Sequence, residues 1–466
     1  MMNTRNPYTS MLLTFNPARV YGWENEISSI LQVITAVEPN GHAIYGIRAI
    51  GKTTLLKYLK DKRGALLHYE DYIQSSYQPG GRGRLLFVYL NFRHFKGKSS
   101  VFDVMLAGLE DEILHEGLET PTSTPYSDAT LSRQHVVNQL RDRLIDLDRY
   151  SVRVVFLLDD FDEPLLETID DDDDRLLRTL CDDAALIIAT ESPISELRPD
   201  LGASSPLLGI LRPEAIGLIS ESAARQLVTE PALDAGVTLS LEEATFLIHV
   251  AGRQPFLLTT ACELYFDMRQ EYPDLAAMIR KTDTRSRFQT QFVYQLCSLP
   301  HVDNLLQRLW SRLDSQEQRA LYAMTQGGSG LPERGNIAAR LANKALAYWD
   351  IKSGYKVFSL LFEDFVRRRF VVETEQSLEP TLSSASSNNI PPIDRALLKY
   401  FLKNPNRVLL FDELLDAVWE ENQKSKRALE AAVHRLRRSL SENEQIMNIR
   451  GKGYKFVMEK TSISMT

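Results

Sequence analysis

Four residues have the types and the spacing of a phosphate-binding loop. Gly46, Gly51, Lys52 and Thr53 match the pattern G-x-x-x-x-G-K-[ST]. The glycines let the backbone curl so that its N–H groups point at phosphate oxygens, Lys52 supplies positive charge near the outer phosphates, and the Thr53 hydroxyl is a ligand for Mg²⁺. The pattern therefore predicts ATP or ADP bound with Mg²⁺. The alternative is a glycine turn that binds nothing.

An acidic pair, Asp159 and Asp160, is the second group that could do chemistry. It follows the apolar run 152–158, and a central parallel strand typically ends in this way at a ligand crevice. We expect Asp159 to join Thr53 in the metal shell, directly or through water, and Asp160 to be the base that orients an attacking water. With Lys52 these two acids form the expected catalytic set. The alternative is that both are solvated acids at a strand end.

Strands and helices must position these groups. A short buried strand is predicted at 43–45, before the loop, and a helix begins after it at 54–59. Further buried strands are predicted at 85–91 and 184–190. Alternating strands and helices predict a doubly wound α/β P-loop NTPase core with a mostly parallel sheet over residues 15–212.

Residues beside these elements complete the expected nucleotide site. Ile50 and Thr54 flank the Gly-Lys-Thr sequence and are expected to contact the nucleotide. Thr190 ends a predicted strand, and Thr190 or Ser192 is placed to sense the γ-phosphate by a hydrogen bond. The equally plain alternative is that these two residues start a turn before Pro193.

Length and composition indicate how many domains the chain has and which classes of protein it does not belong to. A chain of 466 residues suggests about three domains of ~150 residues. The net charge of −8 argues against a wholly basic nucleic-acid coat but leaves room for a local basic module. The 3 cysteines form no C-x-x-C pair, which argues against a metal or disulfide framework. Without a signal-peptide core or an apolar run of ~18 residues, the sequence predicts a cytoplasmic protein with no membrane partner.

Two stretches look unstructured in the sequence. Residues 1–14 suggest a loose leader. The unbroken acidic run Asp170–Asp174 is compatible with a magnesium trap, but a solvated loop is the preferred interpretation.

The chain is expected to be multidomain, and its segments follow from changes in pattern. A helical pattern follows the core, a helix pair with a β-hairpin around 353–354 is winged-helix-like, and a Ser-rich stretch ending in Pro-Pro is a flexible linker. The expected divisions are a leader at 1–14, the core at 15–212, a helical lid at 213–300, a winged-helix-like module at 301–371, the linker at 372–392, a compact domain at 393–458 and a tail at 459–466.

Four motifs in order resemble the STAND branch of AAA+-like P-loop NTPases. They are the Val20-Tyr-Gly-Trp-Glu24 box, the Gly46–Thr53 loop, the Leu157-Leu-Asp-Asp160 strand end and Gly252-Arg-Gln-Pro255, which is similar to the family's glycine-to-proline lid motif. The resemblance covers about residues 15–370. It implies an ATP-binding switch whose winged-helix module docks on the nucleotide domain.

The resemblance also implies residue roles. Val20 and Gly22 would line the adenine pocket, and Pro255 would touch the base or ribose from the lid. Two departures bear on activity, because Trp23 stands where the family usually has arginine and no arginine directly follows Thr190. The enzyme class stays open, with a slow ATPase used as a switch as the expected behaviour.

A stretch of 66 residues near the C-terminus predicts a small basic domain. Residues 393–458 hold 13 Lys and Arg against 9 Asp and Glu, a net of +4. Leu429, Val433, Leu436 and Leu440 follow the spacing of a buried helix stripe, and basic residues follow the opposite face. A basic helix before a glycine-tipped hairpin suits insertion into a DNA major groove, and the alternative is a solvated basic face.

This segment resembles the effector domain of OmpR-type response regulators. The matching strings are Leu414-Leu415 with Val418-Trp419, Val433–Leu440 and Ile449–Phe456, where Gly451 and Gly453 shape a wing and Tyr454 packs its base. The resemblance implies an OmpR-type winged helix that binds double-stranded DNA. The expected DNA contacts are Lys426, Arg427, His434, Arg435, Arg438, Arg450 and Lys452.

Three functions remain open from the sequence. The first is an ATP-switched transcriptional regulator that acts on double-stranded DNA; under this hypothesis RNA polymerase is a further partner and the protein forms a nucleotide-dependent homo-oligomer. The second is a DNA-loading or remodelling AAA+-type ATPase, which requires arginine fingers that the sequence does not display. The third is a STAND defence or signalling NTPase that oligomerises on a trigger. The operator, the activating signal and the sign of regulation are not encoded in a recognisable motif.

Overall fold

The computed structural model describes residues 5–36, 41–76, 83–95, 100–118, 133–200, 205–272, 274–326, 335–352, 354–370, 391–404, 407–418, 425–437, 444–449 and 452–458. These residues belong to two compact units, Met1–Val366 and Arg367–Thr466, and each is described by itself. The expected linker, apart from its last two residues, and the expected tail lie outside the described residues.

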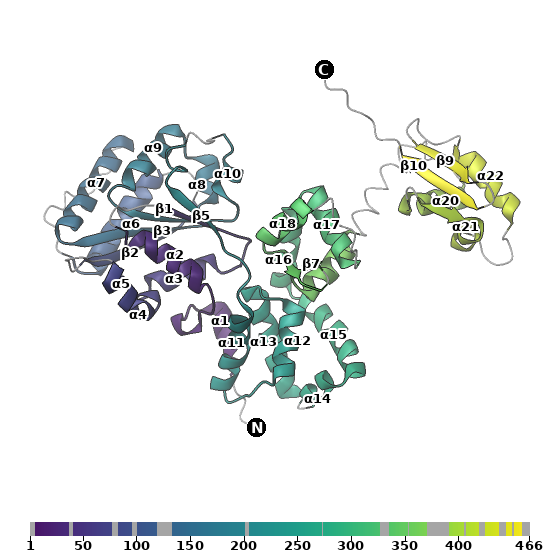
Figure 1. Ribbon diagram of the computed structural model, residues 1–466, viewed down its shortest axis with the longest axis horizontal. Coiled ribbons are helices and arrows are strands. Elements are labelled where there is room, and N and C mark those ends of the chain that lie inside the picture. Colours follow the sequence, from purple (N-terminus) through teal and green to yellow (C-terminus); the bar gives the residue numbers. More distant parts are fainter. Residues whose placement is uncertain are drawn as a thin grey trace, which may run out of the picture. The chain divides into compact units, whose positions relative to one another are not determined.

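A five-stranded parallel sheet forms the core of the first unit (Figure 1). The strands are β1 (Gly41–Tyr45), β2 (Arg84–Asn91), β3 (Val152–Asp159), β4 (Ala185–Thr190) and β5 (Leu211–Ala215). They lie in the order β2-β3-β4-β1-β5 and every neighbouring pair is parallel. The register places Asn91 beside Asp159 and Tyr45 beside Thr190, so the carboxyl ends of four strands meet at one edge. The expectation of a parallel α/β core is confirmed.

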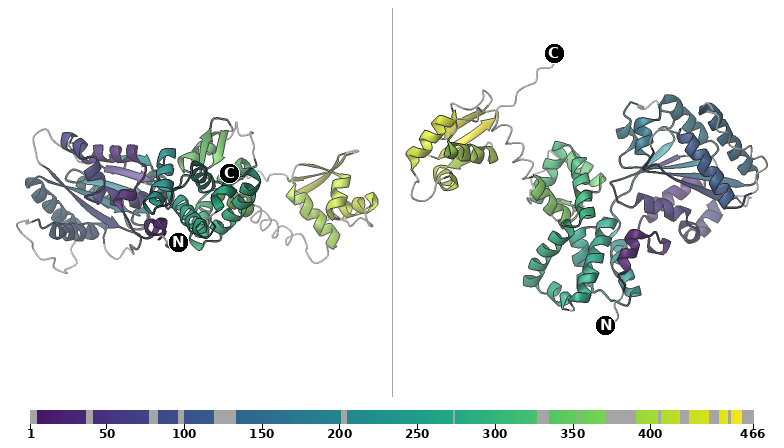
Figure 2. Two further views of the ribbon diagram at one scale, coloured as in Figure 1. Left: turned by 90° about the horizontal axis from the view of Figure 1, so that it is seen from below. Right: turned by 180° about the vertical axis from the view of Figure 1, so that it is seen from behind.

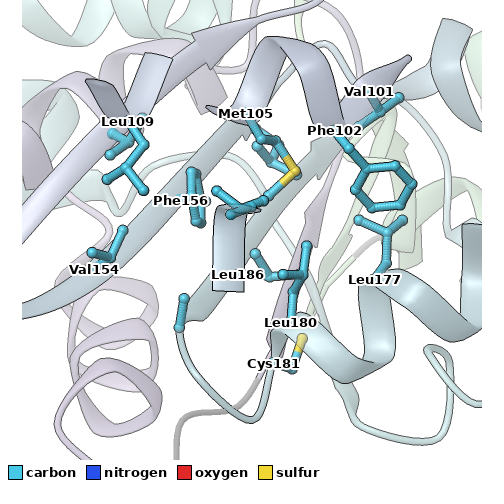
Figure 3. Packing of buried hydrophobic residues seen from close by; sticks show 14 of the residues in the cluster. Val101, Phe102, Met105, Leu109, Val154, Phe156, Leu177, Leu180, Cys181 and Leu186 are labelled. Carbon is cyan, nitrogen blue, oxygen red and sulfur yellow. The ribbon is translucent and has the colours of Figure 1, made fainter. Parts of the chain in front are cut away.

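Helices cover both faces of this sheet, as a doubly wound fold requires. The helices of this part of the chain are η1 (Pro17–Arg19), α2 (Glu24–Ile34), α3 (Lys52–Lys60), α4 (Ala65–His68), α5 (Glu70–Ser76), α6 (Val101–His115), α7 (Arg133–Arg149), α8 (Asp162–Glu167), α9 (Asp171–Leu180) and α10 (Ile194–Leu197), and of these α2, α3, α6 and α7 contact strands of the sheet. Alternate residues of a strand point to opposite faces. Figure 3 shows one face, where Phe156 and Leu186 of the sheet pack with Met105 of α6 and Leu180 of α9.

Strand β5 is absent from the sequence-based expectations. Pro213 lies in its middle, and proline cannot donate a ladder hydrogen bond. Among the residues that the structure describes, β5 pairs with β1 alone and is the edge strand, which is the position where a proline is tolerated.

The acidic run is helical, so its interpretation as a solvated loop is wrong. Asp170 is the N-cap of α9 and its carboxylate accepts hydrogen bonds from the backbone N–H groups of Asp172 and Asp173. Asp173 reaches back to the N–H of Asp170, which completes a capping box. Asp174 is buried and accepts a hydrogen bond from Ser205. Acids in the first turn are favourable because the helix N-terminus carries partial positive charge.

Five helices follow the core: α11 (Glu221–Asp234), α12 (Leu241–Ala251), α13 (Pro255–Glu271), α14 (Leu275–Arg280) and α15 (Thr282–Cys297). The N-terminal helix α1 (Pro7–Leu13) packs against α13 and α11 (Figures 1 and 2). Tyr8 is fully buried there and its hydroxyl donates to the carbonyl of Val228. Residues 7–13 are therefore not a loose leader, because a buried tyrosine fixes the helix on the lid.

Three helices and a hairpin then form a winged-helix-like arrangement. They are α16 (Pro300–Ser311), α17 (Ser315–Thr325), α18 (Gly335–Asn343) and the antiparallel strands β6 (Ala347–Asp350) and β7 (Gly354–Val357), followed by a helix over 360–370. Gly252, between α12 and α13, has φ of +74° and touches this arrangement. A Cβ there would lie 2.5 Å from the carbonyl oxygen of Phe358.

The second unit contains α20 (Pro392–Lys403), β8 (Val408–Leu410), α21 (Phe411–Val418), α22 (Lys426–Arg437), β9 (Glu444–Ile449) and β10 (Gly453–Met458). The strands form an antiparallel sheet in the order β8-β10-β9. Leu429, Val433 and Leu436 of α22 are buried in its core, as their spacing predicts, together with Phe401 and Phe456. Leu440 lies outside the described residues.

Candidate functional site

The phosphate loop joins β1 to α3, and its two glycines are required by close contacts. A Cβ on Gly46 would lie 2.6 Å from the carbonyl oxygen of Ile216. A Cβ on Gly51, which has φ of +114°, would overlap the indole ring of Trp23. The loop therefore has the strand-to-helix context that the motif requires.

Lys52 is almost fully buried at the start of α3, with 6% of its surface exposed. Its ammonium group donates to the carbonyl oxygens of Gly46 at 2.6 Å and Ile47 at 3.3 Å. Burial lowers the pKa of Lys52, and the negative charge of Glu191 is the strongest of the nearby charges that oppose this shift. A buried cation whose direct partners are two neutral carbonyls is suited to receive an anion.

Asp159 lies beneath the loop and is fully buried. One carboxylate oxygen accepts hydrogen bonds from the Thr53 hydroxyl at 2.8 Å, the Tyr89 hydroxyl at 2.8 Å and the Asn91 amide at 3.0 Å. The structure thus brings together Thr53 and Asp159, the two residues expected in the metal shell. Tyr89 and Asn91 are absent from the sequence-based set, although polar residues at the end of a buried strand are a signal that points to them.

Asp160 follows in a left-handed backbone conformation with φ of +53°. Its carboxylate accepts a hydrogen bond from Arg93 at 2.9 Å, and the Asn91 amide lies 3.5 Å away. A non-glycine residue in this region is strained, and such strain is typical of functional sites.

A cavity of about 780 Å³ lies over the loop, between the core, the lid and the winged-helix-like module. The expected site residues that line it are Val20, Gly51, Lys52, Thr53, Thr54, Asp160 and Pro255.

The other expected residues lie behind this lining. Ile50 and Asp159 are fully buried, and Gly22 approaches Ile219. Gly46 lines an adjacent cavity of about 190 Å³. Thr190 is also fully buried, and its hydroxyl donates to the carbonyl of Ser192 at 2.7 Å.

The lid contacts the loop through a residue that the sequence analysis did not single out. Gln254 is fully buried, and its amide donates to the carbonyl of Ala49 at 2.7 Å. Its amide oxygen caps α13 by accepting from the N–H of Leu257, and Pro255 is the first residue of that helix. The glycine-to-proline motif therefore caps a lid helix and holds the phosphate loop at the same time.

Trp23 adds an observation that fits a ligand. It has φ of +65°, 6% of its surface is exposed and it lines the large cavity. Its indole nitrogen is buried and has no hydrogen-bond partner among the described residues. An unpartnered buried donor beside a cavity is costly unless a ligand or water in the cavity accepts from it. Together with Lys52 and the two glycines, Trp23 shows that these residues fit a nucleotide.

Glu191 follows β4 directly, and three arginines converge on it. Arg48 of the phosphate loop lies 3.5 Å away, and Arg308 and Arg312 from the end of α16 lie at 3.3 and 2.7 Å. The Glu191 side chain is 8% exposed, and its backbone N–H donates to the carboxylate of Asp162. Sequence reasoning missed this cluster because each arginine lies more than 100 residues from Glu191 in the chain and the residues fit no motif.

In the second unit, α22 has an apolar buried face and a polar exposed face. Lys426, Arg427 and His434 are exposed, as is Lys452 near the turn of the hairpin. The Lys426 ammonium lies 4.4 Å from the centre of the Phe411 ring. The expected DNA contacts Arg438 and Arg450 lie outside the described residues.

Arg435 has a structural role that the sequence did not suggest. It donates two hydrogen bonds, at 2.6 and 2.7 Å, to the buried carboxylate of Asp394 in α20. Tyr454 is buried at the base of the hairpin and packs edge-on against Phe411, as expected.

Comparison with known proteins assigns this domain. Residues 387–456 match the family model described as "Transcriptional regulatory protein, C terminal". The C-terminal domain is an OmpR-type winged helix. A segment of 95 residues is 33% identical to the transcriptional regulator HilA of Salmonella typhi, over 20% of this chain and 17% of that protein. The chain thus spans about one sixth of the length of this relative.

The chain is also similar to a solved Walker-type ATPase, PABY2304 of Pyrococcus abyssi. The similarity covers 77% of this chain and 100% of that one, with 14% identity and a TM-score of 0.51. At this identity the comparison shows the fold, which is that of a P-loop NTPase. Within the described residues, no helix combines the length and apolar character that crossing a bilayer requires.

Proposed function

We propose that the protein is a transcriptional regulator whose DNA-binding domain is controlled by ATP and Mg²⁺ bound in the first unit. The observation that carries this proposal is the pair formed by Thr53 and Asp159 beside the buried Lys52, in a chain that also has a transcriptional regulatory domain. The STAND-like division into core, lid, winged-helix-like module, linker and DNA-binding domain is part of the proposal, with the boundaries given above.

The residues of the chain have distinct roles in this proposal. Lys52 and the loop N–H groups hold the phosphates, and Thr53 and Asp159 hold Mg²⁺. Asp160 orients water, while Pro255 of the lid contacts the base or ribose. Bound ATP supplies a γ-phosphate that ADP lacks, so the two nucleotides can favour different conformations. We propose slow turnover, which suits a switch.

For the output, we propose that α22 binds the major groove of double-stranded DNA through Lys426, Arg427 and His434, with Lys452 on a phosphate. RNA polymerase contact and nucleotide-dependent self-association remain part of this proposal. Because Arg435 is paired with Asp394, its contribution to DNA binding is expected to be indirect.

Genome-wide DNA footprinting of three proteins tests the proposal. The wild type should give discrete promoter peaks, Arg427→Ala should lose them, and Lys52→Ala should lose ATP binding and change promoter occupancy. Unchanged occupancy and output in a Lys52→Ala protein that no longer binds ATP would rule out the switch. Sequence-independent binding with DNA-stimulated turnover would instead favour the DNA-loading ATPase.

A further inference from the structure

The arginine cluster around Glu191 has two kinds of member. Arg312 approaches one carboxylate oxygen at 2.7 Å, which is a normal charge-assisted hydrogen-bond distance. Arg48 and Arg308 share the other oxygen at 3.5 and 3.3 Å, distances that indicate weak contacts. Glu191 therefore holds one guanidinium closely and two loosely.

The two loosely held arginines are the two that line the large cavity. Arg48 and Arg308 lie in its wall with Lys52, and Arg312 does not. All three arginines line the smaller cavity, so the large cavity is the one that distinguishes them. Geometry thus separates an arginine that fixes the module on the core from two that face the proposed nucleotide.

The position of Lys52 shows which end of the nucleotide the arginines face. The Lys52 ammonium donates to the carbonyl oxygens of Gly46 and Ile47, Arg48 is the next residue of the same loop, and Lys52, Glu191 and Arg308 line the same cavity. In a phosphate loop the lysine contacts the outer phosphates. The arginines paired with Glu191 therefore lie at the outer-phosphate end of the site. Guanidinium groups bind phosphate at least as readily as carboxylate.

We propose that Arg48 and Arg308 are binding residues for the outer phosphates and that Glu191 is the protein carboxylate that competes with the phosphates for them. This inference rests on the proposed nucleotide site. Arg308 lies on α16 of the winged-helix-like module, and Arg48 lies in the phosphate loop of the core, between β1 and α3. When a phosphate binds Arg308, the ion pair between Arg308 of the module and Glu191 of the core is replaced by a contact between Arg308 and the nucleotide. The contacts of the module therefore depend on whether the phosphate is present.

Binding of ATP and of ADP by calorimetry to the purified full-length chain tests this inference. Arg308→Gln and Arg48→Gln should each weaken ATP binding roughly tenfold, and ADP binding less, because each removes a charged hydrogen bond at the outer phosphates. Arg175→Gln is the matched control. It removes one arginine from an exposed ion pair with Asp172 on α9 and should leave the affinity within about twofold.

The variant Glu191→Gln distinguishes two ways in which Glu191 could weaken ATP binding. Its carboxylate could compete with the phosphates for the two arginines, or its negative charge could simply repel the phosphates. The variant should strengthen ATP binding by about fivefold, the upper range for ion pairs in which one partner is exposed to solvent, as Arg48 and Arg308 partly are. If competition is the cause, the gain should fall below about twofold in the Arg48→Gln/Arg308→Gln background, because the competing pairs no longer exist. A gain of equal size in both backgrounds would mean repulsion alone and would overturn the proposal.

The proposed function and this inference fail in different ways. If Lys52→Ala binds ATP as the wild type does, the nucleotide site itself is wrong. If Lys52→Ala loses binding while Arg48→Gln and Arg308→Gln keep wild-type affinity for both nucleotides, only the inference is wrong. Circular dichroism and thermal melting of each variant separate lost contacts from lost folding.

Discussion

Gln254 of the lid donates its side-chain amide to the carbonyl oxygen of Ala49 in the phosphate loop, 2.7 Å away. Ala49 has φ of +61°, a conformation that costs energy for a residue with a Cβ. The hydrogen bond from Gln254 therefore helps to hold the loop in a strained form. Because Gln254 contacts both the lid helix α13 and the phosphate loop, one substitution at this residue tests the stability of the lid and the support of the loop together.

We expect Gln254→Ala to lower the free energy of unfolding by about 1–2 kcal/mol, because it also removes the cap of α13. ATP affinity should fall roughly three- to tenfold as the loop loses its support. Ser240→Ala is the control, since Ser240 caps α12 by accepting from the N–H of Glu243 and does not line the cavity. It should lose similar stability in urea unfolding and keep its ATP affinity. Equal affinity loss in both variants would contradict a specific role for Gln254.

Lys52→Met should stabilise the protein while abolishing ATP binding. The buried ammonium group costs free energy, and we expect the apolar side chain to recover about 1–2 kcal/mol. Burial lowers the pKa of Lys52 below its ordinary value of 10.5, so in alkaline solution the unfolded chain holds this proton more tightly. The cost is therefore present at neutral pH and shrinks as pH rises from the lowered pKa towards 10.5. Urea unfolding against pH should show the advantage of Lys52→Met shrinking over that window; an advantage that grows with pH would contradict it.

Arg435→Ala should weaken DNA binding through stability rather than through a lost base contact. The substitution leaves the Asp394 carboxylate, which is 1% exposed, without its bidentate partner. Because Arg435 is half exposed, we expect a loss of about 2 kcal/mol in the free energy of unfolding of the second unit.

The double variant Asp394→Leu/Arg435→Met distinguishes the two roles. It replaces the ion pair with apolar side chains and should recover most of the stability. If Arg435 acts only through Asp394, the double variant should also recover DNA affinity in a gel-shift titration. Recovered stability with DNA affinity still lost would show that Arg435 contacts DNA. Arg427→Ala should lose DNA affinity with little change in melting temperature.

Trp23 should report nucleotide binding by fluorescence. Its ring lies against Gly51 and its buried indole nitrogen has no partner among the described residues, so a bound nucleotide changes its surroundings. Emission should shift when ATP is added to the wild type, and Trp23→Phe should lose that shift while Trp310 still emits. A shift that persists in Trp23→Phe would assign the signal to another tryptophan.

The sequence predicted the parts of the site that follow from short-range chemistry. The phosphate loop, the strand ending at Asp159 and the proline that starts α13 are each encoded within a few consecutive residues, so their patterns can be recognised in the sequence. Glu191 was missed because its meaning depends on Arg48, Arg308 and Arg312 meeting it in space. Strand β5 was missed because Pro213 is a poor strand residue except at a sheet edge, and edge position is a tertiary property.

In the second unit the same distinction holds. The spacing of Leu429, Val433 and Leu436 predicted the buried face of α22, since helical periodicity is local. The same spacing placed Arg435 on the exposed side of α22, and the structure confirms this. The spacing gave no indication that Arg435 pairs with Asp394. Asp394 lies 41 residues earlier, and no local rule links the two.

The close approach of Gly252 to Phe358 determines how motion can pass between modules. The turn between α12 and α13 and the segment after β7 meet without space for one methyl group. The turn that carries Gln254 therefore packs directly against the winged-helix-like module. Because the two segments are in contact here, we expect a rotation of the turn to be transmitted to the module. A Gly252→Ala substitution would force the two segments apart while leaving every nucleotide-facing residue unchanged.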